Sequence, residues 1–205
     1  MENQKLFEKY SDGNHWESHP TSYAQEFEKF LSNESLKTEA LRAMVITHPA
    51  FFITDLGCGN GRDVHHFNKI GLPAIGFDND TQVLQLAKET YPKLAAVFFH
   101  EDLEQLPFLD NTQFSHFCIN VMHYVDQEKV LGEIYRTLKT GGYAFIHFNL
   151  LIIDENYSID YHQKKSDVYE LIRKFEIVEE KIFLREDPLP MPHTHHIMQV
   201  ILRKN

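Results

Sequence analysis

Three glycines at alternating positions are the residues whose spacing most clearly indicates chemistry. Gly57, Gly59 and Gly61 follow an apolar run at residues 50–53 and precede residues 63–70, where apolar side chains recur at helical spacing. This order predicts a buried strand, a tight turn and a helix. Glycines in such a turn let the backbone bend and let a ligand approach closely, and the first amides of the helix give a slightly positive pocket. The stretch therefore predicts a ligand-binding turn, of a kind that several nucleotide-binding families share.

Polar residues also follow each of the next predicted strands. They are Asp78 after residues 73–77, Glu101 and Asp102 (followed by Leu103) after residues 95–99, and Asn120 after residues 114–119. Asp78 stands about 20 residues beyond the turn, where an acid can accept both ribose hydroxyls of an adenosine ligand. Because ligands of open α/β sheets bind at the carboxyl ends of strands, we expect these residues to share one site with the glycines.

Taken together, these motifs resemble those of the class I S-adenosylmethionine-dependent methyltransferases. Residues 55–61 look like the first motif of that family, Phe77-Asp78 like its ribose-binding acid, and residues 101–103 like its adenine-side acid. Residues 138–142 (Leu-Lys-Thr-Gly-Gly) resemble its Leu-Lys-Pro-Gly-Gly turn, with Thr140 in place of the proline. Ser115 stands where many members have an aspartate. The resemblance covers roughly residues 35–205.

The family resemblance implies the fold. We expect a three-layer, Rossmann-like α/β domain with seven strands, mostly parallel with the last strand antiparallel, and helices on both faces of the sheet. One methyltransferase domain would cover residues 1–205, with residues 1–33 as an N-terminal helical cap or lid. Tyr10, Trp16 and Tyr23 are candidates for closing the site, and packing against the sheet is the alternative role for these aromatic rings.

The pattern also predicts the later elements and the helix starts. We expect helices at residues 21–31, 34–46 and 164–174, helices capped by Asp80 and Asp126, a fifth strand at 143–148, an irregular loop at 149–162, and strands at 175–184 and 196–202 joined by a stiff proline-rich link. The strand at 196–202 is apolar at both parities, which predicts insertion between the two strands before it as an antiparallel strand.

S-adenosylmethionine is the cofactor that the resemblance implies. The implied cofactor-binding residues are Asp55, Gly57, Cys58, Gly59, Asn60, Gly61, Arg62, Asp78, Asn79, Asp102, Leu103 and Asn120. The first motif and Asn120 would hold the methionine end, Asp78 the ribose and Asp102 the adenine. Arg62 would pair with the methionine carboxylate, or it is an ordinary arginine on a helix surface.

A sulfonium methyl group is already activated, so such an enzyme mainly positions the nucleophile and excludes water. His123 and Tyr124 follow the fourth strand, where members of the family face the substrate. Either side chain could accept a proton from the nucleophile, so we take both as catalytic candidates. The alternative for His123 is a packed or surface histidine.

A cluster of histidines, His193, His195 and His196, precedes the last strand. Imidazole is a ligand for zinc, copper and nickel. However, adjacent strand residues point to opposite faces, so His195 and His196 cannot share one metal ion within a strand. No cysteine lies near them in the sequence, and we predict no metal site. We expect one histidine to face the substrate cleft and another to be structural.

The charge balance favours a small-molecule methyl acceptor. The 205 residues carry a formal net charge of −10, which argues against a nucleic-acid partner or an anionic membrane surface. Cys58 and Cys118 are expected to act as small hydrophobes in a reducing compartment. The first residues have no signal-peptide pattern and the longest apolar stretch, 143–153, is too short for a bilayer, so we expect a cytoplasmic protein. The sequence does not indicate an oligomeric state.

Two other functions remain open at this point. One is a module that binds S-adenosylmethionine without transferring its methyl group. The other is a nicotinamide-dependent oxidoreductase, whose fingerprint requires a third glycine at position 62, where Arg62 stands. An antiparallel last strand would also be out of place in that class.

Overall fold

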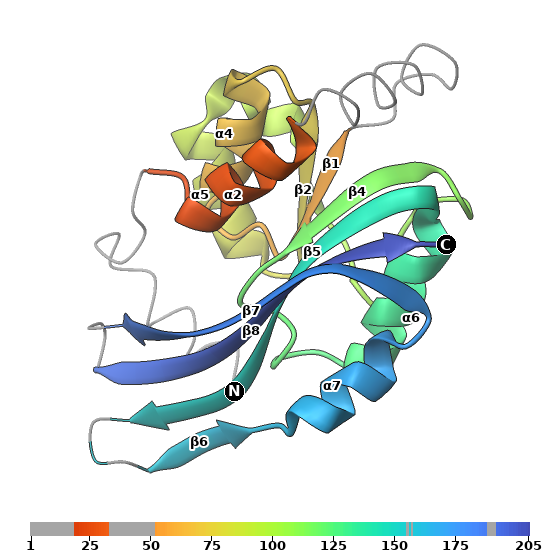
Figure 1. Cartoon of the computed structure of the whole chain (residues 1–205). Coiled ribbons are helices and arrows are strands. Elements are labelled where there is room, and N and C mark those ends of the chain that lie inside the picture. Colours follow the sequence, from red (N-terminus) through yellow and green to blue (C-terminus); the bar gives the residue numbers. More distant parts are fainter. Residues whose placement is uncertain (1–18, 33–51, 155, 157, 188–191) are drawn as a thin grey trace.

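The computed structural model describes residues 19–32, 52–154, 156, 158–187 and 192–205. Its centre is a twisted eight-stranded sheet in the order β3-β2-β1-β4-β5-β8-β7, with β6 paired to β5 off this path (Figure 1). The strands are β1 (Ile53–Leu56), β2 (Ala74–Asp78), β3 (Phe98–His100), β4 (Gln113–Cys118), β5 (Leu138–Asp154), β6 (Ile159–His162), β7 (Phe175–Asp187) and β8 (His193–Lys204).

The sheet is parallel from β3 through β5 and antiparallel at β8, as the sequence predicts. β1 pairs in parallel with β2 and β4, and β5 pairs in parallel with β4. β8 lies between β5 and β7 and runs antiparallel to both. Ile197, Met198, Val200 and Ile201 are all buried, because this inserted strand is covered on both faces. The β6 hairpin strand raises the count from the seven expected strands to eight.

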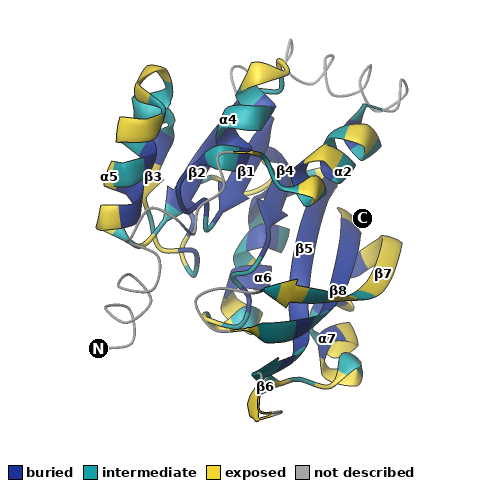
Figure 2. Ribbon diagram, turned by 90° about the vertical axis from the view of Figure 1, so that its left-hand side faces the viewer, coloured by how far each residue is buried: buried dark blue, intermediate teal, exposed yellow. Residues whose placement is uncertain are grey.

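Helices cover both faces of the sheet, and each face has its own apolar core (Figures 1 and 2). The helices are α2 (Ser22–Leu31), α4 (Arg62–Lys69), α5 (Thr81–Thr90), α6 (Gln127–Thr137) and α7 (Lys165–Ile172), with a 3₁₀ helix at Pro92–Val97. One core joins α2, α4 and α5 to the sheet through Phe27, Phe67 and Phe117. The other joins α6 and α7 to it through Ile134, Val168 and Met198.

Side-chain caps begin three of these helices. Thr21 accepts a hydrogen bond from the Ala24 amide at the start of α2, and Asp80 and Asp126 cap α5 and α6 as predicted. Among the helices of the described ranges, none combines the length and the apolar character needed to cross a bilayer. The predicted helix at 34–46 and the aromatic residues Tyr10 and Trp16 lie outside the described residues.

Two strand predictions are wrong in extent. The third strand is only Phe98–His100, because residues 92–97 form the 3₁₀ helix that Pro92 begins. The predicted loop at 149–162 is instead the second half of β5 and the strand β6, since β8 pairs with β5 as far as Asp154. The proline-rich link is shorter than predicted, because β7 continues to Asp187 and β8 begins at His193.

Candidate functional site

The glycine turn lies between β1 and α4, at the carboxyl end of the parallel strands. Gly57, Gly59 and Gly61 all have left-handed backbone, with φ of 80°, 53° and 77°. A β-carbon at Gly57 would lie 2.2 Å from Val121 Cγ2, and one at Gly61 would lie 2.5 Å from the Phe98 ring. The turn therefore requires glycine at these two positions for both its backbone and its space.

Asp78 lies directly against this turn. Its Oδ2 accepts a hydrogen bond from the Gly59 amide at 2.9 Å, and its Oδ1 accepts one from the Asp80 amide at 3.0 Å. Burial raises the pKa of Asp78 even though these amides favour the carboxylate. The end of β2 thus brings an acid to the glycine turn, which is the arrangement expected for an adenosine ligand; its role in binding remains a prediction.

Two further acids lie beneath the turn. Asp55 at the end of β1 is buried, and burial together with the charges of Asp63 and Asp78 raises its pKa well above the ordinary value. Asp63 accepts hydrogen bonds from the Thr21 amide at 2.7 Å and the Thr21 hydroxyl at 3.1 Å, and burial raises its pKa too. Asp63 therefore ties the start of α2 to the start of α4, beside the glycine turn.

Sequence reasoning missed Asp63. An acid in the first turn of a helix is a visible signal, because it complements the helix dipole. Its partner Thr21 lies 42 positions away, however, so the contact between the two helices could not be inferred from local pattern.

The other predicted cofactor residues of the turn are packed or hydrogen-bonded within it. Asn60 is buried, and its side-chain oxygen accepts a hydrogen bond from the Arg62 amide at 3.3 Å. Cys58 is also buried, and burial raises the pKa of its thiol well above the ordinary value, so it is a packing group and not a nucleophile. The positive charge of Arg62 partly opposes the rise in the pKa of Asp55 that burial causes.

Asn79, predicted beside the ribose acid, follows β2, and the predicted adenine-side residues Asp102 and Leu103 follow β3. Asn79 is exposed, and its carbonyl oxygen lies 3.1 Å from His100 Nε2. Asp102 is exposed and accepts a hydrogen bond from the Glu104 amide at 2.8 Å, so its carboxylate caps its own turn. Leu103 belongs to the apolar core. None of these contacts decides the predicted cofactor roles.

On the opposite side of the turn, a chain of four side chains connects β7, β8, β5 and the segment after β4. Asp187 Oδ2 lies 3.2 Å from His195 Nε2. His195 Nδ1 lies 2.9 Å from Asn149 Oδ1, and Asn149 Nδ2 lies 2.8 Å from His123 Nδ1. An amide oxygen only accepts and an amide nitrogen only donates. Nδ1 of His195 is therefore a donor, and Nδ1 of His123 is an acceptor.

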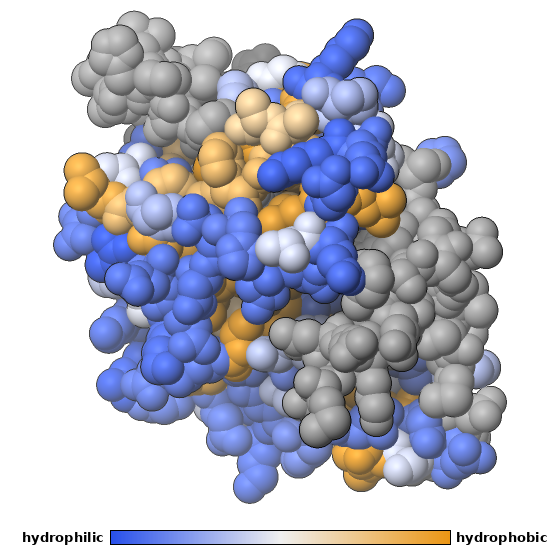
Figure 3. All heavy atoms as spheres, turned by 180° about the vertical axis from the view of Figure 1, so that it is seen from behind, coloured by the Kyte–Doolittle hydropathy of each residue, from blue (hydrophilic) through white to orange (hydrophobic). Residues whose placement is uncertain are grey.

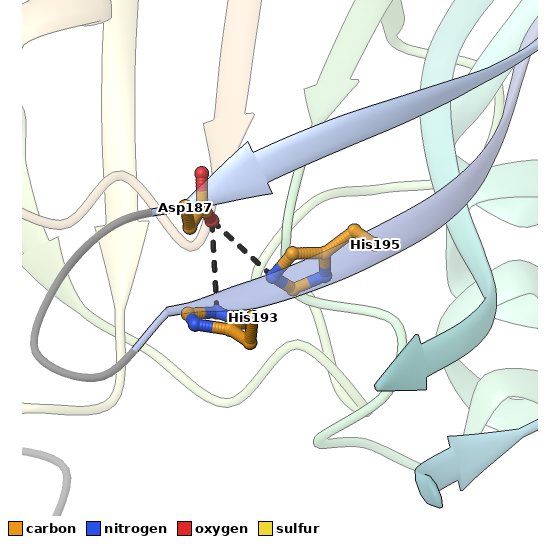
Figure 4. Close-up of side chains that lie close together, drawn as sticks. All are labelled: Asp187, His193 and His195. Carbon is orange, nitrogen blue, oxygen red and sulfur yellow. Dashed lines mark ion pairs between the residues drawn. The ribbon is translucent and has the colours of Figure 1, made fainter. Parts of the chain in front are cut away.

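Asp187 is the charged end of this series of interacting side chains. Its Oδ2 also lies 2.8 Å from Arg185 Nη2. The same oxygen lies 3.7 Å from His193 Nε2 (Figure 4). Burial raises the pKa of Asp187, but the hydrogen bond from His195 and the charge of Arg185 outweigh it and hold the pKa below the ordinary value. Burial lowers the pKa of His195 despite its acidic partner.

Arg185 connects this series of side chains to the predicted methionine side of the cofactor site. Its Nη1 donates to Asn120 Oδ1 at 2.6 Å, and Asn120 itself adopts a left-handed backbone with φ of 60°. Arg185 also donates a hydrogen bond to the Tyr23 hydroxyl oxygen. The predicted lid residue Tyr23 packs against the sheet, with its ring 4.4 Å from that of His147 and 5.7 Å from that of Phe183.

The two predicted catalytic residues lie together after β4. The ring centroids of His123 and Tyr124 are 3.8 Å apart, and Tyr161 on β6 lies 5.9 Å from His123. Tyr124 is 56% exposed, so it can be reached by a ligand. His196 points to the face of β8 opposite His195 and does not belong to the cluster of Asp187, His193 and His195.

The sequence predicted no metal site, yet Asp187, His193 and His195 lie together. Each offers one ligand atom, and these atoms are all within 4.8 Å of one another. The signal that could have found them is parity: His193 and His195 share one face of β8, and the register with β7 pairs Asp187 with His193. That register could not be predicted, because the sequence does not show where β7 ends.

Comparisons with known proteins agree with the fold and the motif. Residues 54–146 match the family described as "Methyltransferase domain". Sterol 24-C-methyltransferase of Schizosaccharomyces pombe is 28% identical over 170 residues, which cover 70% of this chain and 44% of that protein. The chain therefore spans less than half the length of that relative.

Two solved structures share the architecture at low sequence identity. A putative methyltransferase from Bacillus halodurans superposes with a TM-score of 0.62 at 17% identity, covering 82% of this chain and 99% of the other. Magnesium protoporphyrin IX methyltransferase from Synechocystis, solved with bound S-adenosylmethionine, gives a TM-score of 0.59 at 14% identity, covering 97% of this chain and 91% of the other. At these identities the likeness establishes the fold.

Proposed function

The chain belongs to the class I S-adenosylmethionine-dependent methyltransferase family, and from this premise we propose that it transfers the methyl group of S-adenosylmethionine to a small-molecule acceptor. The observation that carries the proposal is the contact between Gly59 and Asp78, because it places an acid against a turn that only glycines can form. That arrangement fits an adenosyl group: the ribose needs an acceptor for its hydroxyls, and the ligand backbone needs room beside the turn.

Different residues around the turn would bind the ribose and the methionine end of the cofactor. Asp78 would accept the ribose hydroxyls, and the amides of the turn and of α4 would face the methionine carboxylate. Asn120, held by Arg185, would line the methionine end. The cofactor, when bound, supplies a sulfonium-activated methyl group, so this chain needs mainly to orient the acceptor and to exclude water.

His123 is the side chain best placed to orient that acceptor. Its Nδ1 accepts a hydrogen bond from Asn149, so the neutral ring carries its proton on Nε2. We therefore assign His123 Nε2 the role of hydrogen-bond donor to the acceptor molecule, in place of the proton acceptor expected from the sequence. Tyr124, packed against His123 and exposed on its other side, would contact the same molecule.

Small-molecule specificity is supported by charge and by the relatives. The net charge of −10 disfavours a phosphate backbone, and Figure 3 shows hydrophilic side chains over much of one face, with apolar ones gathered toward its upper part. The two named relatives are described by small acceptors, a sterol and magnesium protoporphyrin IX. The buried, unpaired Cys58 and Cys118 are consistent with the reducing cytoplasm as the compartment.

Calorimetric titration tests the proposal. S-adenosylmethionine and S-adenosylhomocysteine should bind the full chain, and Asp78→Ala should weaken that binding by about 10- to 100-fold, since hydrogen bonds to charged groups are worth about 1.5–3 kcal/mol. Glu89→Ala, which removes an exposed carboxylate on α5, is the matched control and should leave the affinity unchanged.

Two outcomes would overturn the proposal. Preferential binding of a nicotinamide dinucleotide would assign the chain to the oxidoreductases. Binding of S-adenosylmethionine with no release of S-adenosylhomocysteine across sterol, tetrapyrrole, phenol and carboxylate acceptors would make it a non-catalytic binding module.

A further inference from the structure

We propose that Asp187, His193 and His195 bind one divalent transition-metal ion at the end of the β7–β8 hairpin. Carboxylate and imidazole groups converge there from two neighbouring strands (Figure 4). The existence of this site rests on the geometry of the hairpin alone. Its use in binding the methyl acceptor rests on the proposed function, because the site is connected to His123 through Asn149.

The spacing of the three ligand atoms is close to that of an occupied site. Asp187 Oδ2 lies 3.2 Å from His195 Nε2 and 3.7 Å from His193 Nε2. Ligand atoms about 2.0–2.2 Å from a tetrahedral metal ion are about 3.3–3.6 Å from one another. All three ligand atoms lie within 4.8 Å of one another, so coordination would require the side chains to draw the two imidazole nitrogens closer together.

Strand pairing places these ligands and keeps them rigid. In the antiparallel register of β7 and β8, Asp187 is opposite His193 and Arg185 is opposite His195. All four side chains consequently lie on one face of the hairpin. The side chains of His193 and His195 are only 16% and 7% exposed, so two imidazoles are already withdrawn from bulk water.

The hydrogen bond from His195 to Asn149 favours a metal ligand at the other ring nitrogen. Because Nδ1 donates to Asn149 Oδ1, Nε2 is the ring nitrogen of His195 that faces the Asp187 carboxylate, at 3.2 Å. A proton on Nε2 makes this contact a hydrogen bond, and a metal ion in place of that proton would bridge the same two atoms. Metal-bound histidines commonly donate their second nitrogen to an amide or carbonyl oxygen in this way.

The ligand chemistry defines the class of ion. Two imidazoles and one carboxylate suit Zn²⁺, Fe²⁺ or Co²⁺, whereas Mg²⁺ and Ca²⁺ require mainly oxygen ligands. Three protein ligands leave at least one position open, as in catalytic zinc sites. An oxygen of the acceptor could fill that position, and this would make the acceptor a hydroxyl- or carboxylate-bearing molecule.

Arg185 is the group that must share the carboxylate with the ion. Its Nη2 donates to the same Oδ2 at 2.8 Å, while its Nη1 is held by Asn120. The ion and the guanidinium would therefore share Oδ2 of Asp187, unless the carboxylate rotates to offer one oxygen to each. This contact keeps the carboxylate ionised and oriented, as hydrogen-bonded groups around metal ligands commonly do.

Metal titration of the full, untagged chain tests the site. After treatment with a chelator and dialysis, Zn²⁺ should bind by calorimetry at one ion per chain with a Kd of about 1 µM or tighter. Co²⁺ should give the visible absorption of a site with nitrogen ligands. His193→Ala and His195→Ala should each abolish both signals, and Asn149→Ala should weaken Zn²⁺ binding by about 10- to 100-fold.

His196→Ala is the matched control, because this neighbouring histidine lies on the other face of β8, and it should bind Zn²⁺ as the unchanged chain does. Thermal unfolding without metal would show that each variant is folded. Absence of saturable Zn²⁺ binding, or binding that survives loss of both His193 and His195, overturns the metal site. In that case His195 and Asp187 form a proton-mediated ion pair. Calorimetry with S-adenosylmethionine on the same samples shows separately whether the proposed function stands.

Discussion

At the residue scale, the two glycines at the ends of the turn are the positions where the structure most strictly requires glycine. Gly57 and Gly61 combine left-handed backbone with a side-chain space already filled by Val121 and Phe98. Val121 belongs to the segment after β4 and Phe98 to β3, so the two ends of the turn pack against two different parts of the fold. A cofactor approaching the turn therefore meets a surface whose shape is set before binding.

Gly57→Ala should lower the free energy of unfolding by more than the about 1–2 kcal/mol that left-handed backbone alone costs a residue with a β-carbon. The reason is that the new methyl group would lie 2.2 Å from Val121 Cγ2. Urea unfolding measures the change. Gly132→Ala is the control: it lies within α6 with open space around it and should stabilise by about 0.5–1 kcal/mol. Equal effects at the two positions would contradict the argument.

The sequence identified these residues better than it identified the acceptor side. Glycine spacing and an acid at a strand end are local patterns, and the structure places Gly59 and Asp78 in contact. The chain from Asp187 to His123 depends on four separate segments. Asn149 illustrates the difference. As a polar residue after an apolar run, it indicated the end of a strand, but it lies within β5 and its side-chain amide bridges two histidines.

At the element scale, polar contacts hold both the start and the middle of α2. Asp63 in the first turn of α4 accepts both the amide and the hydroxyl of Thr21, the residue that caps α2. Further along α2, Glu28 lies 3.0 Å from His66 of α4, and Glu26 accepts hydrogen bonds from Lys181 and Gln199. The pair of Asp63 and Thr21 therefore determines where α2 begins, and the packing of Phe27 against Phe117 and Phe145 determines which face of the sheet it covers.

Asp63→Ala should loosen α2 selectively. The change leaves the partly buried Thr21 amide without its acceptor, which costs about 1–3 kcal/mol, and frees the N-terminus of the helix. Hydrogen exchange followed by mass spectrometry should show faster exchange at residues 22–31 and unchanged protection of α6. Asp126→Ala removes the cap of α6 and should give the reverse pattern. Uniform loss of protection in both helices would mean that Asp63 acts on global stability instead.

At the scale of the whole molecule, the alternation of parallel strands and helices was predicted from the sequence, but the length of β5 was not. This alternation depends on repeated local patterns of strand, turn and helix. The extension of β5 to Asp154 depends on pairing with β8, and even its last pair, Asp154 with His193, joins residues 39 positions apart in the chain. That extension is what brings β6, Tyr161 and Asn149 to the acceptor side.

We expect the folded protein to lose stability as the pH falls, because a histidine is buried in the core between the sheet and α6. His116 on β4 is buried, with Nε2 2.8 Å from the Thr137 hydroxyl, and burial lowers its pKa from 6.5 to about 3. The unfolded chain therefore binds a proton at this site between those two values while the folded chain does not. Stability is consequently full above pH 6.5 and falls as the pH drops.

Comparison of the unchanged chain with His116→Leu isolates this contribution. Urea unfolding at pH 7.5 and pH 5 should show that the unchanged chain loses roughly 2 kcal/mol more than the variant over this interval. The raised pKa values of Asp55, Asp63 and Asp78 act in the opposite direction, but they are common to both proteins and cancel in the difference. His147, whose pKa burial also lowers to about 3, cancels in the same way. A difference in stability that is independent of pH would show that His116 is protonated equally in the folded and unfolded chains.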